Sequence, residues 1–78
     1  MTEFSNEQLE EIHCLILFDL NNTHEGLKVH HNARAESIEA MRRLYKKGMI
    51  TQDDGGYLTS LGKEAAEFAH GLKSILRD

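Results

Sequence analysis

The residues best suited to chemistry in this sequence are its five histidines and its single cysteine. His24, His30 and His31 fall within one short stretch, and Cys14 lies upstream of them. Imidazole and thiolate groups bind metals or act as redox centres when they converge on one point. The sequence contains no His-x-x-x-His or Cys-x-x-Cys pair, the spacings typical of metal and redox sites. We therefore predict surface or turn histidines, with no metal site and no cofactor. A metal or redox sensor using His30, His31 and Cys14 is the least favoured alternative.

Paired carboxylates are the other candidates for catalysis. They occur as Glu10–Glu11 and Asp53–Asp54. Acid–base catalysis needs two carboxyl groups that face one cleft with separated pKa values, whereas neighbours on a helix or turn are usually solvated. Cys14 stands in an apolar segment close to acids, whereas a reactive thiol needs a cationic, accessible setting. We predict that the chain is not an enzyme and has no small-molecule substrate.

The basic residues point to a different chemistry, the binding of phosphates. The chain has 13 acidic and 9 basic residues and a formal net charge of −4. The acids dominate residues 1–33, whereas bases are concentrated in residues 34–47. Nucleic-acid affinity comes largely from bases that neutralise phosphates. The candidate nucleic-acid-binding residues are Lys28, Arg34, Ser37, Arg42, Arg43, Lys46 and Lys47.

The N-terminal half of the sequence predicts three helices that would position these residues. Ser5 followed by Gln8 forms a capping box, and apolar residues continue at helical spacing until Asn21. Thr23 could cap a short second helix through residues 25–29. A third helix is expected from about residue 33 to residue 47, with Gly48 after its end.

The C-terminal half predicts a hairpin and a final helix. Residues 49–52 and 57–59 are expected to form the strands, with Asp-Gly at the centre of the turn over 53–56. Thr59 caps the last helix, whose apolar residues recur at spacings of four, three, four and three. This stripe could pack on the first helix or on a second copy of the chain. Its residues are the candidate dimerisation residues Leu61, Phe68, Leu72 and Ile75.

The stretch from residue 41 to residue 65 resembles the winged helix-turn-helix of bacterial regulators. The resemblance rests on Leu44-Tyr45-Lys46-Lys47-Gly48-Met49-Ile50, followed after the hairpin by Tyr57-Leu58-Thr59-Ser60-Leu61-Gly62. It implies one domain over residues 1–78, mainly α with a small β-hairpin: three helices, a wing and a C-terminal helix. The third helix would enter the major groove of DNA and the wing would touch the backbone. The wing, however, carries Asp53 and Asp54 and no lysine or arginine.

Two further segments, Phe18-Asp19-Leu20 and residues 25–31, give the whole chain a resemblance to a small family of uncharacterised proteobacterial proteins. That resemblance implies a compact stand-alone domain and brings no activity with it.

Two functions follow as hypotheses. The leading one is non-catalytic DNA binding by a transcriptional regulator. The alternative is a protein-interaction module or homodimerising adaptor that has lost DNA binding. The longest apolar run, residues 14–18, is too short to cross a bilayer, and no signal peptide is evident. A small domain without an intrachain disulfide is typical of the cytoplasm, so we predict a cytoplasmic protein without a membrane partner.

Overall fold

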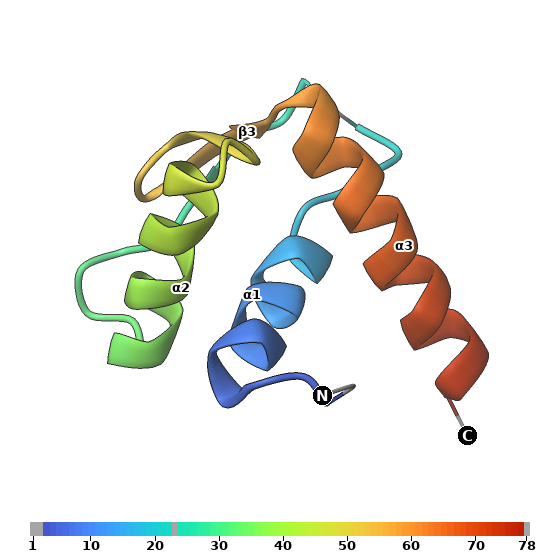
Figure 1. Ribbon diagram of the computed structural model, residues 1–78. Helices are drawn as coiled ribbons and strands as arrows, with labels where there is room; N and C mark the ends of the chain where they lie inside the picture. The colour runs from blue at the N-terminus through green and yellow to red at the C-terminus, as the bar shows by residue number, and fades with distance from the viewer. Residues whose placement is uncertain (1–2, 23, 78) are drawn as a thin grey trace.

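The computed structural model describes residues 3–22 and 24–77. This part of the chain forms three helices and a three-stranded antiparallel sheet, a mixed α/β fold. The elements are, in order, α1 (Asn6–Ile16), β1 (Leu27–Lys28), α2 (Ala35–Lys46), β2 (Ile50–Gln52), β3 (Gly55–Leu58) and α3 (Ser60–Leu76). Helix α1 lies between α2 and α3, and the sheet lies at the end where α3 begins (Figure 1).

The start of α1 is as the sequence predicts, but its end comes earlier. The Ser5 side chain accepts a hydrogen bond from the Gln8 amide at 3.0 Å, and the Gln8 side chain accepts one from the Ser5 amide at 2.9 Å. The helix ends at Ile16 and does not continue to Asn21. The Asp19 side chain accepts from the Asn21 amide at 2.8 Å. Such a local bond gives the backbone an alternative to the helix.

The prediction of a short second helix through residues 25–29 is wrong. Its proposed cap, Thr23, lies outside the described residues, and the segment after it forms the strand β1. Leu27 and Val29 are half-buried on either side of exposed Lys28, which is the alternation of a strand. The described chain therefore has one helix fewer and one strand more than the predicted mainly α fold.

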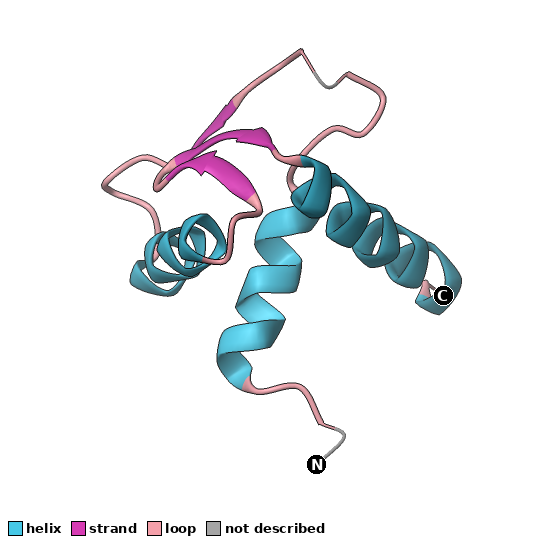
Figure 2. Ribbon diagram, turned by 45° about the horizontal axis from the view of Figure 1, so that its top comes forward, coloured by secondary structure: helices cyan, strands magenta, loops and turns pink. Residues whose placement is uncertain are grey.

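The predicted hairpin is confirmed, with a shifted turn. The two-residue loop is Asp53–Asp54, so the Asp-Gly pair expected at its centre straddles the start of β3. Gly55 has a φ of +134°, and a β-carbon there would collide with the Leu27 carbonyl oxygen. This glycine thus allows β1 to pair with β3, which gives the sheet order β1–β3–β2 (Figure 2).

The core lies between the three helices and the sheet. Its largest fully buried side chains are Met41 and Leu44 of α2 and Cys14 of α1. The Thr59 cap of α3 is confirmed, since its hydroxyl accepts from the Gly62 amide at 3.1 Å. Gly62 also meets the backbone of Met49 so closely that a β-carbon would not fit. Helix α3 is thereby held against the start of the hairpin at its N-terminal end.

Within residues 3–22 and 24–77, no helix has both the length and the apolar character that a membrane span needs.

Candidate interaction surfaces

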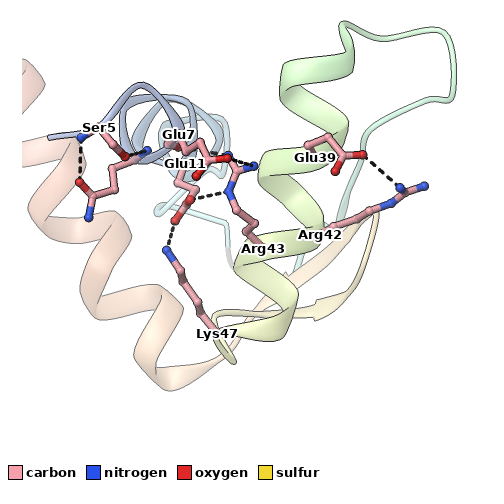
Figure 3. Close-up of polar contacts among 8 residues, drawn as sticks. Ser5, Glu7, Glu11, Glu39, Arg42, Arg43 and Lys47 are labelled. Carbon is pink, nitrogen blue, oxygen red and sulfur yellow. Dashed lines mark hydrogen bonds and ion pairs between the residues drawn. The ribbon is translucent and has the colours of Figure 1, made fainter.

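Helix α1 is joined to α2 by a network of charged side chains centred on a buried carboxylate. Glu11 is only 6% exposed. The Arg43 Nε donates to Glu11 Oε2 at 2.7 Å, and the Lys47 ammonium donates to Glu11 Oε1 (Figure 3). Arg43 also donates to the Glu7 carbonyl at 3.2 Å. We call Glu7, Glu11, Arg43 and Lys47 the α1–α2 ion-pair network.

The environment of Glu11 favours its charged form. Burial by itself would raise the pKa of its carboxyl group. The hydrogen bonds from Lys47 and Arg43, with the charges of both bases, outweigh burial and lower the pKa below the ordinary 4.5. The hydrogen bond to Glu11 in turn raises the pKa of Arg43. Glu11 and Arg43 are therefore both charged at neutral pH, and each provides the hydrogen-bonding partner of the other.

The seven candidate nucleic-acid-binding residues do not share one surface. Arg34, Arg43 and Lys47 are engaged by acids of α1, with 3.0 Å between Arg34 Nη2 and Glu10 Oε1. Ser37 is half-buried, and its carbonyl accepts a hydrogen bond from the Cys14 thiol at 3.9 Å.

The three remaining candidates lie on the other side of α2 or in β1. Arg42 points away from α1 and pairs with Glu39 of its own helix at 3.1 Å (Figure 3). Lys28 and Lys46 are exposed, and neither forms an ion pair with another described residue. A groove beside Lys28 and Arg42 is also lined by the acids Asp53 and Asp54 and by His30 and His31.

The signal that sequence analysis missed is the acidic pattern of α1. Glu7, Glu10 and Glu11 are three and four residues apart and so share one face of the helix. A face of acids on one helix and bases at helical spacing on another, Arg43 and Lys47, indicates internal pairing as readily as phosphate binding.

The histidines and the cysteine do not converge. Within residues 3–22 and 24–77, no group of three or more potential metal ligands is close enough to hold an ion. His70 Nε2 lies 3.0 Å from the Phe18 carbonyl oxygen. Cys14 is only 2% exposed, and burial raises the pKa of its thiol to about 11. Such a thiol is a core side chain and not a nucleophile at neutral pH.

The candidate dimerisation residues, in contrast, are all at the surface. The exposed fractions are 50% for Leu61, 71% for Phe68, 43% for Leu72 and 81% for Ile75. Helix α3 packs against the core through the small residues Gly62, Ala66 and Ala69 instead.

Further exposed side chains extend this stripe. Leu76 of α3 is exposed, as are Phe4 and Leu9 across an apolar groove between α1 and α3. Ile12 and Ile16 contribute to the groove from α1. We call the exposed set the α1–α3 apolar surface; it consists of Phe4, Leu9, Leu61, Phe68, Leu72, Ile75 and Leu76.

These features define a small mixed α/β domain whose central helix has a charged contact on one side and an apolar, partly open contact on the other. The chain belongs to the family of unknown function DUF5669, whose model matches residues 2–77. No curated protein and no solved structure matches the chain.

Proposed function

We propose that this protein is a non-catalytic interaction module that forms homodimers through the α1–α3 apolar surface. The observation that carries the proposal is the exposure of seven large apolar side chains, five of them on α3, with Leu9 on α1 and Phe4 just before α1. Their exposed fractions add up to about four whole side chains, on the order of 700 Å² of apolar area. The largest contiguous apolar patch on a typical monomer is roughly 300–600 Å², so the summed apolar area of these seven residues is at or above what one such patch exposes.

A second copy of the chain is a partner of the right size and chemistry. Two copies that cover this surface on each other would bury on the order of 1,400 Å², within the roughly 1,200–2,000 Å² of stable interfaces. In a two-fold dimer each copy supplies the same apolar patch, so one surface satisfies both chains. The groove in this surface is lined mainly by apolar side chains, together with His13, Lys73 and Arg77, which is a composition compatible with the apolar core and polar rim of a homodimer interface.

Sedimentation over a concentration series tests this proposal. We expect a reversible dimer whose dissociation constant changes little with salt, since apolar burial is not screened by ions. Replacing Phe68→Gln together with Ile75→Gln should weaken the dimer by about a hundredfold or more while leaving the fold intact, because both side chains are largely exposed.

The matched control is Glu67→Gln together with Ser74→Gln, which changes exposed residues one position earlier on α3. It should leave the dimer unchanged. A protein that stays monomeric at high concentration, or two double variants with equal effects, would contradict the proposal.

DNA binding is the second candidate function, favoured by the position of α2. Helix α2 leads directly into the β2–β3 hairpin, the order of recognition helix and wing in the winged helix-turn-helix that the sequence resembles. Of the seven candidate contacts, those available outside the α1 side of α2 are Lys28, Arg42 and Lys46. Three phosphate contacts would give a salt slope of roughly −3.

A chemical-shift titration with a short mixed-sequence DNA duplex tests this second candidate. Amide shifts at residues 28–31 and 42–46 that disappear at high salt would support it. If no shifts occur at low salt and high protein concentration, the DNA-binding hypothesis fails and the winged-helix resemblance carries no binding activity.

A further inference from the structure

We infer that two copies pair α3 against α3 in antiparallel orientation, with the two-fold axis on the exposed face of α3 at the level of residue 70. The inference rests on the homodimer proposed above and adds its geometry. It follows from the spacing of the apolar residues on α3, their sizes and the way that this helix leaves the core.

Between residues 65 and 75, the part of the stripe that follows Leu61, the spacing is the same in both directions. Ala65, Phe68, Leu72 and Ile75 are separated by three, four and three residues. An antiparallel helix centred on residue 70 therefore meets the same pattern between residues 65 and 75, and Leu61 lies outside this pairing. Phe68 comes opposite the partner's Leu72, and Ala65 comes opposite the partner's Ile75.

The side-chain sizes favour this orientation over the parallel one. In the antiparallel pair the smallest residue of the stripe, Ala65, which is half-buried against its own core, lies beside the large Ile75 of the partner subunit. A parallel pair in register would place Phe68 against Phe68 of the partner subunit and Ala65 against Ala65 of the partner subunit. Facing layers that combine large with small side chains fill space at native density, whereas two alanines leave a void.

The position of α3 in the fold points the same way. Its N-terminal half is held to the core by Gly62, Ala66 and Ala69, whereas every residue from 71 to 77 is exposed. Helices α1 and α3 diverge toward the C-terminal end of α3 (Figures 1 and 2). In an antiparallel dimer, the core-bound N-terminal half of the partner's α3 packs along the exposed residues 71–77. It also covers the opening of the groove between α1 and α3.

Disulfide crosslinking distinguishes the two orientations. Two single variants, Ala65→Cys and Ile75→Cys, are oxidised separately and as a mixture, and intact mass identifies the linked chains. In the antiparallel dimer, two copies of residue 65 lie about 15 Å apart along the helices, as do two copies of residue 75. A disulfide needs β-carbons roughly 3.5–4.5 Å apart, so only the mixed pair should link, in roughly tenfold excess or more.

The native thiol does not interfere with this test. Cys14 is buried and its pKa is raised to about 11, so the unmodified protein serves as the uncrosslinked control. Phe68→Cys with Leu72→Cys forms a second pair in case the first disturbs the local packing. Here two copies of one residue lie about 6 Å apart along the helices, so the mixed pair should again be favoured, by a smaller margin.

The outcomes separate the inference from the function on which it rests. Crosslinks within each single variant would show a parallel pair and overturn the inference while the homodimer stands. A sedimenting dimer without any crosslink from either cysteine pair would also overturn it. A protein that sediments only as a monomer would instead remove the proposed function itself.

Discussion

The two sides of α1 hold their neighbours by different physical means. Toward α2 the contact includes a buried carboxylate bonded to two bases, and these charges are used within the molecule. Toward α3 the contact is made by small apolar residues, and the large ones remain exposed. Three of the bases that suggested a nucleic-acid-binding surface, Arg34, Arg43 and Lys47, are instead paired with acids of α1. The apolar stripe of α3, for which the sequence allowed either an internal contact or a second copy, is exposed.

We expect the largest loss of stability when the central carboxylate of the α1–α2 ion-pair network is removed. Glu11→Gln leaves Arg43 and Lys47 without their shared carboxylate, in a place that is only partly open to solvent. Because the variant loses two hydrogen bonds between charged groups, those from Arg43 and Lys47 to the buried carboxylate, we expect a loss of about 2–4 kcal/mol in the free energy of unfolding. Urea unfolding measures it.

The control for that variant is Glu39→Gln, which removes an exposed pair with Arg42. Its expected cost is about 0.5 kcal/mol or less. Equal losses in the two variants would show that burial of Glu11 contributes nothing.

Lowering the pH should remove the stabilising contribution of Glu11 from the wild-type protein as well. The folded-state pKa of Glu11 is lowered, so its stabilising effect is present above the unfolded-state pKa, near 4.5. It is lost as the pH falls from about 4.5 through the lower folded-state value. We therefore expect the stability difference between the wild type and Glu11→Gln to shrink below pH 4.5, in unfolding curves recorded from pH 7 to pH 3. A difference that stays constant over this range would contradict the role of the ionised carboxylate.

Two adjacent arginines offer a sharper test of the same comparison. Arg43→Gln removes the bonds to Glu11 and to the Glu7 carbonyl, whereas Arg42→Gln removes only the exposed bond to Glu39. We expect a cost of about 1.5–3 kcal/mol for Arg43→Gln and about 0.5 kcal/mol or less for Arg42→Gln. Thermal unfolding of the two variants, side by side, decides between a structural and a surface role for each.

The smallest effect is expected on the apolar side. Gly71 lies in the exposed half of α3, and a β-carbon there would meet nothing. Gly71→Ala should raise the stability by roughly 0.5–1 kcal/mol, because alanine loses less conformational freedom in a helix. A decrease in stability, measured by thermal unfolding at a concentration where the protein is monomeric, would show that this half of α3 is not helical in the monomer.

Much of the local structure could be predicted from residues close together in the chain. The Ser5 and Thr59 caps and the hairpin depend on bonds that span a few residues, so their patterns are visible in sequence. Strand β1 was missed because it exists through pairing with β3, some 28 residues later. Two residues of strand have no local signal strong enough to exclude a short helix.

The candidate sites show the same division. The sequence by itself determined that α3 carries an apolar stripe and that bases gather around α2, because these properties belong to single helices. Only the tertiary structure decided that Arg34, Arg43 and Lys47 face the acids of α1 and that the stripe of α3 faces outward. The physical reason is that a side chain's partner depends on which face of a helix is turned toward its neighbour. Here the close approach of Gly62, Ala66 and Ala69 to the core sets that rotation for α3.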